Sequence, residues 1–254
     1  MTDAYLDDAY ASYWHTIEAE LDDPAPVAVY DLDEPFSSDT PQEIIDAYTE
    51  FSTMSEDWMP DRYYTADVLA LGDYTLEGSE AHHLATVLRA QPGQPIILFN
   101  GDGADWRAVI AEAGKKRVTV TIVERIDVHR EREFRWTIAA AMPKGDRGDF
   151  MIEKLTELGV SRFVPLVTER TVVIPKVSRI ESLRRTVVEA SKQCGRNVLM
   201  EVSEPVKWSA FAKSELPAMK MLLHTTGAAA FVRPASDAVI AIGPEGGFTE
   251  DETR

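Results

Sequence analysis

The sequence predicts a small all-β domain followed by an α/β domain with a mainly parallel sheet, both preceded by an acidic segment. Three observations carry this prediction. Residues 1–61 contain 17 Asp and Glu and no Lys or Arg, whereas the rest of the chain balances 26 acidic residues with 26 basic ones. Short strands and turns then follow, and after Phe134 strands alternate with helices. We place the three parts at residues 1–58, 59–132 and 133–254.

The all-β domain is predicted from a hairpin and a strand. Apolar segments at residues 96–99 and 106–111 are joined through Asn100-Gly101, a pair that tolerates the positive φ of tight hairpin turns. At residues 118–123 Val and Ile alternate with Thr, the period of a strand with one buried face. One short helix is expected at 79–88. We therefore predict a compact β-barrel.

The α/β domain is predicted from apolar segments that alternate with amphipathic helices. Strands are expected at residues 136–142, 163–167, 219–223 and 238–242. Helices are expected at 149–158 and 178–194, because apolar residues recur at helical spacing and Gly159 or Gly195 follows to end the helix. The second helix is predicted to begin with a capping box at residues 178–181.

The acidic segment alternates short apolar groups with acidic and turn residues, so we predict that residues 1–58 are mostly disordered. One helix is expected at 41–51, with Thr40 as its N-cap and Glu43 in the capping-box position.

Composition excludes several classes of protein. The chain has 254 residues, 44% hydrophobic and 27% charged, as in ordinary globular proteins. No apolar run approaches the length of about 18 residues that spans a membrane. The first basic residue is Arg62, which leaves no cationic region for a signal peptide, and Cys194 is the only cysteine. We therefore expect a cytoplasmic protein without a membrane or a disulfide.

A glycine-rich segment at residues 242–248 is the most informative motif. It follows a predicted buried strand and precedes a capping box at 249–252. Such a turn lets the backbone approach a ligand and offers unpaired N–H groups. The segment matches neither the dinucleotide fingerprint nor the phosphate-binding loop of nucleotide-binding enzymes. The alternative is a tight turn whose glycines only supply positive φ.

The predicted helix at 178–194 is the second signal. Glu189, Gln193 and Arg196 recur at helical spacing, so they are expected to share one face. That face is either an ordinary solvated surface or a surface that meets phosphate. The second interpretation is favoured by nearby basic residues, which are Lys144, Arg147, Arg170, Arg184, Arg185 and Lys192.

No metal site is predicted. His82 and His83 are adjacent, so on a helix they point about 100° apart and cannot both bind one ion. Cys194 falls at a packing position of its helix rather than in a reactive setting.

Several short motifs occur in a fixed order between about residue 59 and residue 254. They are Arg62-Tyr63-Tyr64, His82-His83-Leu84, Asn100-Gly101-Asp102-Gly103, Met142-Pro143-Lys144-Gly145-Asp146-Arg147, Glu153-Lys154 with Glu157-Leu158-Gly159-Val160, Pro165-Leu166 with Thr168-Glu169-Arg170, Glu189-Ala190 with Gln193-Cys194-Gly195-Arg196, and Gly243-Pro244-Glu245-Gly246-Gly247-Phe248. Together they resemble the 16S rRNA (uracil(1498)-N3)-methyltransferases, a family of the SPOUT superfamily.

This resemblance implies a PUA-like β-barrel that binds RNA, joined to a SPOUT-type α/β domain with a trefoil knot. It also implies a homodimer that acts on the small ribosomal subunit with S-adenosylmethionine as cofactor. The cofactor-binding residues implied are Leu223, His224, Ile242, Gly243, Pro244, Glu245, Gly246 and Gly247. The RNA-binding residues implied are Arg62, Lys144, Arg147, Lys154, Arg184, Arg185 and Lys192.

The implied chemistry suits these residue types. The enzyme must place an activated methyl group beside uracil N3 and ease loss of the N3 proton. A guanidinium near the uracil carbonyl oxygens would stabilise the developing anion without a metal. We hypothesise that Arg196, or alternatively Arg170, does so while Gln193 orients the base.

Two departures from the family pattern bear on activity. The family pattern continues beyond Gly-Phe with segments that complete the knot, so we expect an incomplete knot and weak cofactor binding. The acidic segment is extra, and it is either an early start or a competitor for RNA. A non-catalytic RNA-binding or ribosome-assembly module is therefore the alternative function, while a nucleotide-phosphate binder is disfavoured.

Overall fold

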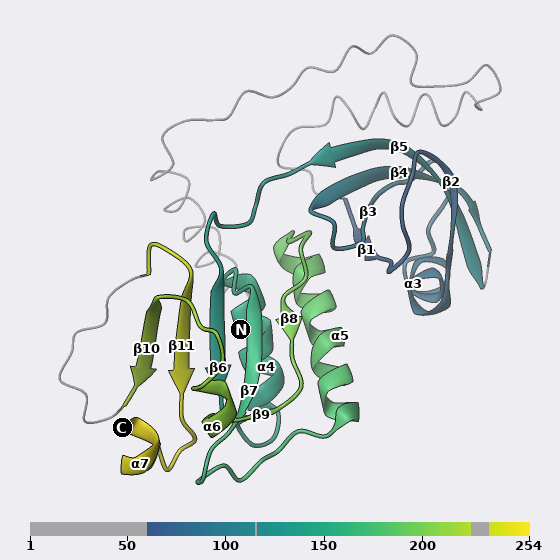
Figure 1. The fold of residues 1–254 in the computed structure, drawn as a ribbon. Helices are drawn as coiled ribbons and strands as arrows, with labels where there is room; N and C mark the ends of the chain where they lie inside the picture. The colour runs from purple at the N-terminus through teal and green to yellow at the C-terminus, as the bar shows by residue number, and fades with distance from the viewer. Residues whose placement is uncertain (1–59, 115, 225–233) are drawn as a thin grey trace, which may run out of the picture. The chain divides into compact units, whose positions relative to one another are not determined.

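The structure, a computed structural model, describes residues 60–114, 116–224 and 234–254 (Figure 1). Within these residues the chain forms two sheets that follow one another in sequence. The segment predicted to be disordered, 1–58, and the helix predicted at 41–51 lie outside the described residues.

The first sheet has five strands in the order β1-β3-β4-β5-β2 and is strongly curved (Figure 1). Strands β3, β4 and β5 pair antiparallel, which confirms the hairpin predicted at the Asn-Gly turn. Gly101 adopts φ 91° there, a conformation that favours glycine. The parallel pairing of β1 with β3 was not predicted. The strands are β1 Arg62–Tyr64, β2 Gly72–Glu77, β3 Pro95–Phe99, β4 Ala104–Ala113 and β5 Arg117–Asp127.

The core of this sheet follows the predicted alternation. Val118, Val120 and Ile122 of β5 are all buried in one apolar cluster. The predicted helix at 79–88 closes part of that cluster, but it forms in two pieces, α3 Gly78–His82 and the π-helical turn η1 His83–Val87. The wider turn lets Ala81 and Leu84 both reach the core, while the two histidines stay exposed.

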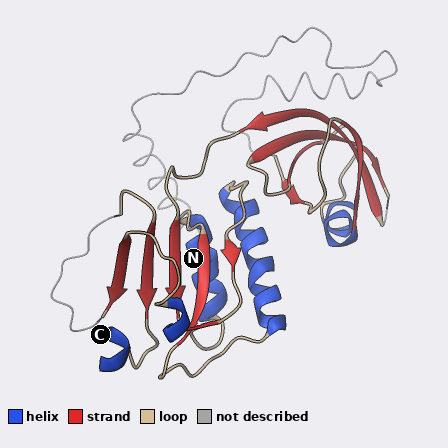
Figure 2. Cartoon of the chain, in the orientation of Figure 1, coloured by secondary structure: helices blue, strands red, loops and turns tan. Residues whose placement is uncertain are grey.

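The second sheet is parallel throughout its described pairs. Its order is β10-β11-β6-β7-β8, with β9 also beside β7. The arrows of β10, β11, β6 and β7 point the same way (Figures 1 and 2). The four strands predicted in this domain are present, whereas β8 and β9 were not predicted. The strands are β6 Trp136–Ala140, β7 Arg162–Val167, β8 Glu201–Val202, β9 Val206–Lys207, β10 Met219–Leu223 and β11 Ala238–Ile242.

Alternate residues of the parallel strands feed two separate cores. Ile138 and Ile240 pack with the helices α4 Arg147–Glu157 and α5 Val177–Cys194. Ala139 and Val239 belong to the opposite cluster, which includes the short helix α6 Trp208–Phe211. A parallel sheet buried on both faces is the arrangement that strand and helix alternation predicts.

The helices α4 and α5 end at the predicted glycines, but one of the two predicted capping boxes is absent. Gly159 and Gly195 adopt φ 75° and 73°, as expected where α4 and α5 end. The capping box predicted at 178–181 is wrong. The extended backbone of Lys176 starts α5 at Val177, with no side-chain cap, so the Ser178 hydroxyl falls inside the first turn. The second predicted box is confirmed, with Thr249 capping α7 Glu250–Thr253.

Candidate functional site

The loops that follow the parallel strands meet at one edge of the second sheet. Leu223, the last residue of β10, is in register with Ile242, the last residue of β11. Residues 223–224 and 243–247 therefore leave the sheet side by side. In parallel α/β sheets, ligands bind at this carboxyl edge. Most cofactor-binding residues implied by the motifs thus lie together, and we call residues 223–224 with 243–249 the glycine-turn site.

Packing behind the turn explains two of its residues. Phe248 is 3% exposed, and its ring lies 4.9 Å from the Trp208 ring of α6. A Cβ on Gly243 would stand 3.0 Å from the Phe248 ring and 3.2 Å from the Gly247 carbonyl carbon. Only glycine therefore lets the chain fold back so closely. Gly247 adopts φ 69°, and its N–H donates to the Pro244 carbonyl at 2.8 Å.

Arg170 holds the outer side of the turn. It follows β7, and its Nη1 donates to the Gly246 carbonyl at 2.5 Å and to the Phe248 carbonyl at 3.5 Å. A Cβ on Gly246 would lie 3.3 Å from Arg170 Cδ, so the arginine stem occupies that side. The residue is exposed, and its recorded bonds use only Nη1 within the described part of the chain. Donors therefore remain at the glycine-turn site.

Glu252 ties three loops together beneath the turn. Its carboxylate accepts the backbone N–H groups of Thr249 and Glu169, each at 2.9 Å. Its carbonyl accepts the Trp208 indole N–H at 2.9 Å. Burial by itself would raise the pKa of Glu252, but the Thr249 and Glu169 amides outweigh it and lower the pKa. The turn thus rests on a fixed polar support.

The residues that face outward here suit a ligand with both apolar and polar parts. Leu223, at the end of the edge strand β10, is 43% exposed, and His224 beside it is exposed. No atom lies within 4 Å of the position that a Cβ on Gly247 would take. Lys144 and Arg147, from the loop after β6 and the start of α4, are also exposed. An open glycine backbone, an exposed aliphatic side chain and cations provide the contacts that a nucleoside-like cofactor needs.

Arg196 lies at the other edge of the sheet. Gly195 ends α5 in the left-handed conformation, so the chain turns and Arg196 leaves the helical face shared by Glu189 and Gln193. Its Nη1 donates to the carbonyls of Thr156 and Val160, at 3.0 and 2.9 Å, just before β7 begins. The glycine turn instead follows the end of the parallel strand β11. The structure therefore does not bring Arg196 to the turn within one chain.

The burial of Arg196 argues further against a catalytic part. The residue is 5% exposed, and its remaining nitrogens bind both oxygens of Glu131 at 2.7 Å. Every nitrogen of the guanidinium thus makes at least one hydrogen bond within the protein. Gln193 is exposed near the same end of α5, so it too lies away from the turn. Within one chain, Arg196 and Gln193 therefore form no joint pocket with the turn.

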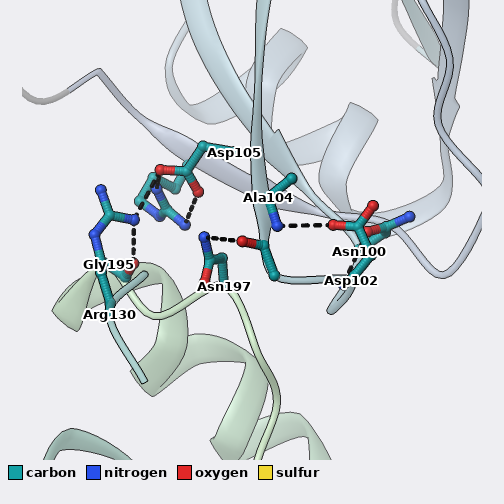
Figure 3. Close-up of polar contacts among 9 residues, drawn as sticks. Asn100, Asp102, Ala104, Asp105, Arg130, Gly195 and Asn197 are labelled. Atoms are coloured by element: carbon teal, nitrogen blue, oxygen red, sulfur yellow. Dashed lines mark hydrogen bonds and ion pairs between the residues drawn. The ribbon is translucent and has the colours of Figure 1, made fainter. Parts of the chain in front are cut away.

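Arg62 is also a buried structural residue rather than a surface contact. It is 7% exposed and binds both oxygens of Asp105 on β4, at 2.9 and 2.8 Å. Arg130 donates to the same carboxylate at 2.8 Å and to the Gly195 carbonyl at 2.7 Å (Figure 3). Asn197 donates to the Gly103 carbonyl at 3.0 Å. These residues join the first sheet to the end of α5.

Asp105 is the centre of this junction. It is 4% exposed. Burial by itself would raise its pKa, but the hydrogen bonds and charges of Arg62 and Arg130 outweigh burial and hold the pKa below its usual value. The carboxylate is therefore ionised at neutral pH and shared by two arginines.

The other predicted RNA-binding residues differ in how far their side chains already bind groups of the protein. Lys192 binds Glu80 of α3 at 3.2 Å with a side chain only 12% exposed. Lys154 binds Glu157 and Glu153, whose carboxylates raise its pKa. Arg184 donates to the Val202 carbonyl and to Glu204, whereas Arg185 is exposed and makes no recorded bond with described residues.

The carboxylates that bind Arg62 and Arg196 were not predicted from the sequence. Asp105 and Glu131 gave no signal, because a lone carboxylate in a strand or linker looks the same whether buried or solvated. Phe248 was visible as the end of the glycine motif, but its contact with Trp208 depends on tertiary packing.

Among the described residues, no group of three or more His, Cys, Asp or Glu is placed to hold a metal ion. No helix in the same residues is long and apolar enough to cross a membrane.

Comparisons with known proteins match both sheets. A family model described as an RNA methyltransferase domain matches residues 130–254, and one described as an RNA methyltransferase PUA domain matches residues 76–123. Ribosomal RNA small subunit methyltransferase E of Synechocystis is 33% identical over 187 residues, which cover 70% of this chain and 61% of that relative. The Rickettsia conorii protein of that name is 30% identical and covers 67% of this chain and 71% of its own length.

A solved structure agrees with these matches. The ribosomal RNA small subunit methyltransferase E of Neisseria gonorrhoeae, bound to S-adenosyl methionine, aligns with a TM-score of 0.70 and 29% identity. The alignment covers 77% of this chain and 84% of that one. The first sheet therefore corresponds to a PUA domain and the second to an RNA methyltransferase domain. The chain belongs to the ribosomal RNA small subunit methyltransferase E family. It spans 61% of the Synechocystis relative's length.

Proposed function

We propose that this protein transfers a methyl group from S-adenosylmethionine to N3 of a uridine in 16S rRNA of the small ribosomal subunit. The observation that supports it most is the glycine-turn site, where residues 223–224 and 243–249 meet at the carboxyl edge of a parallel sheet. The family match supplies the class of reaction. The proposal includes a SPOUT-type α/β fold around this site and a cytoplasmic location, where ribosomes are assembled.

The site residues divide the work by position. Leu223, His224 and the backbone of residues 243–247 would hold the cofactor. Leu223 is exposed, and at Gly247 no side chain keeps a ligand from the backbone. The cofactor supplies a methyl group on a positively charged sulfur. The protein must then favour the N3-deprotonated uracil and hold it in line.

Arg170 is the residue best placed to stabilise that anion. Its Nη1 fixes the turn and its charge helps to lower the pKa of Glu252, while its other nitrogens make no hydrogen bond with the described residues. A guanidinium aimed at a uracil carbonyl oxygen stabilises the charge that builds up there as the N3 proton leaves. Lys144 and Arg147 are exposed at the same edge and would contact phosphates of the RNA.

The proposal also includes a homodimer. Large apolar side chains are exposed where α4 and α5 begin, and these two helix starts are joined by the ion pair of Arg179 with Asp149 at 3.0 Å. The exposed side chains are Phe150, Val172, Ile174 and Val177. An apolar group of this size on a soluble domain is typical of a protein interface.

A methyl-transfer assay tests the proposal. Small ribosomal subunits from cells that lack the family's enzyme would be incubated with the full chain and radiolabelled S-adenosylmethionine. We expect label in 16S rRNA, located at uridine N3 by nuclease digestion and mass spectrometry, and no label in subunits already modified. Cofactor binding measured by calorimetry without any methylation of unmodified subunits would contradict the proposed reaction and favour the RNA-binding alternative.

A further inference from the structure

A groove of about 650 Å³ lies along α5, apart from the glycine-turn site. Its floor is apolar and comes from the middle of α5 and from the chain around β8, including Val187, Leu199 and Met200. One wall is Tyr64, at the end of β1 in the first sheet. Its volume lies within the range of about 300–1,000 Å³ that holds small ligands.

The position of the groove separates it from the proposed chemistry. Strand β8 pairs with Arg162 and Phe163, the first residues of β7, so the groove reaches toward the amino edge of the sheet. The glycine turn follows the carboxyl end of β11, which runs parallel to the same strands. A ligand in the groove is therefore not at the site of methyl transfer.

The polar lining of the groove contains Tyr64, two arginines, Ser203 and two carboxylates. Both carboxylates are paired, Glu201 with Arg162 and Glu204 with Arg184, each at 3.2 Å. Arg184 and Arg185 lie on its rim, and Arg185 makes no recorded bond with the described residues. Arg184 keeps its position by donating to the Val202 carbonyl at 2.9 Å. Tyr64 packs against Phe99 with ring centroids 5.5 Å apart, which orients its ring. An aromatic side chain next to an apolar floor and a free guanidinium is the arrangement that stacks a nucleic-acid base and binds its phosphate.

The two walls of the groove are held together by buried polar contacts. Arg130 joins Asp105 of the first sheet to the Gly195 carbonyl at the end of α5. Lys192 of α5 binds Glu80 of α3 and lies 5.6 Å from the centre of the Tyr63 ring. The distance between Tyr64 and α5 is thus fixed before any ligand binds, which limits the ordering cost of binding.

We propose that this groove is a second RNA subsite, which binds an unpaired base that flanks the target uridine by stacking on Tyr64 while Arg185 contacts its phosphate. The inference rests on the proposed function, because it takes RNA as the substrate. It goes beyond that function by assigning sequence-tolerant binding of a single-stranded nucleotide to a position away from the methyl-transfer site. An arginine alone would bind an acidic peptide as well as RNA. The Tyr64 ring favours RNA, because stacking on it needs a flat partner such as a base.

Binding of a short fluorescein-labelled single-stranded RNA, followed by fluorescence anisotropy over a series of salt concentrations, tests the subsite. We expect Tyr64→Ala to weaken binding about ten-fold with an unchanged salt dependence, and Tyr64→Phe to bind like the unaltered chain. Arg185→Ala is expected to reduce the slope of log affinity against log salt by about 0.7, the value for one phosphate contact on a single strand. Lys213→Ala removes an equal charge from an exposed turn after α6 and is expected to change neither quantity.

The same variants separate this inference from the proposed function. Should Tyr64→Ala and Arg185→Ala bind RNA as the unaltered chain does, the subsite is wrong, even if methyl transfer to ribosomes is normal. Should RNA binding follow the expected pattern while no methylation occurs, only the proposed reaction is wrong. An altered oligomer mass in sedimentation with unchanged RNA affinity would identify the groove as a protein interface and overturn the subsite.

A crosslinking measurement covers the case in which Tyr64→Ala fails to fold. RNA containing 4-thiouridine would be irradiated with the unaltered protein and the crosslinked peptides sequenced by mass spectrometry. We expect crosslinks in the peptide that contains Tyr64 or in the peptides that contain residues 184–204. Crosslinks confined to other peptides would overturn the subsite.

Discussion

The two edges of the parallel sheet use arginine in opposite ways. At the amino edge Arg196 is buried and every nitrogen of its guanidinium is hydrogen-bonded within the protein. At the carboxyl edge Arg170 is exposed, and the hydrogen bonds that it makes with described residues use a single nitrogen, which supports the turn. Both residues were candidates from the sequence for stabilising the uracil anion. The comparison teaches that burial and bonding, rather than residue type, separate an arginine that holds the fold from one that can act on a substrate.

The same contrast extends to the acids. Asp105 at the junction is bound by two arginines and has a lowered pKa, whereas Glu245 of the turn is exposed. The charged groups near the amino edge therefore contribute to stability, whereas those at the carboxyl edge remain accessible to a ligand.

The largest effect is expected at the junction. Asp105→Ala leaves Arg62 buried without its partner, and breaking a buried pair in this way costs about 3–5 kcal/mol of unfolding free energy. Urea unfolding measured by circular dichroism checks this value. Asp102→Ala is the matched control, because its exposed carboxylate only caps the Ala104 amide and is expected to cost about 1 kcal/mol. Equal losses for the two variants would contradict the assignment of Asp105 as the centre of the junction.

The next effect concerns turnover and compares Arg170 with Arg196 directly. Arg170→Ala is expected to lower kcat by about 10²–10³-fold, the usual cost of one donor to a developing anion, with little change in stability. Arg196→Ala is expected to lower the unfolding free energy by about 3 kcal/mol and to leave turnover per folded molecule unchanged. Steady-state methyl transfer and urea unfolding on both variants provide the measurement. The comparison fails if Arg196→Ala loses turnover while its stability is unchanged.

The smallest effect is a dependence of stability on pH. The folded pKa of Asp105 is depressed, so its contribution is fully present above the unfolded value of about 3.9 and is lost as pH falls through the lower folded value. Below about pH 4 the unfolding free energy should therefore fall more steeply for the unaltered chain than for Asp105→Asn. Asp127→Asn, at an exposed ion pair with Arg125, should keep the steeper slope. Equal slopes of unfolding free energy against pH for all three chains would contradict the contribution assigned to Asp105.

Much of the fold was visible in local patterns. The strands at 219–223 and 238–242 and the ends of α4 and α5 at Gly159 and Gly195 were predicted correctly, because period and glycine chemistry act over a few residues. The parallel partner of β3 was not, since nothing in residues 62–64 marks which strand they will join.

The site was predicted in part for the same reason. The glycine turn was found because its residues are contiguous, and the structure explains Gly243 through the Phe248 ring. The placement of Arg196 was not found, because its partners Glu131, Thr156 and Val160 are distant in sequence and carry no motif of their own. Helical spacing alone assigned it to a face that the chain leaves at Gly195.

The single thiol of the chain gives the junction a chemical reporter. Cys194 is the last residue of α5, and burial raises the pKa of its thiol, although the neighbouring Arg196 acts in the opposite direction. At neutral pH the sulfur is therefore mostly protonated and a slow nucleophile. Because the side chain is only partly buried, its rate of alkylation reports how accessible this helix end is, without any label being introduced.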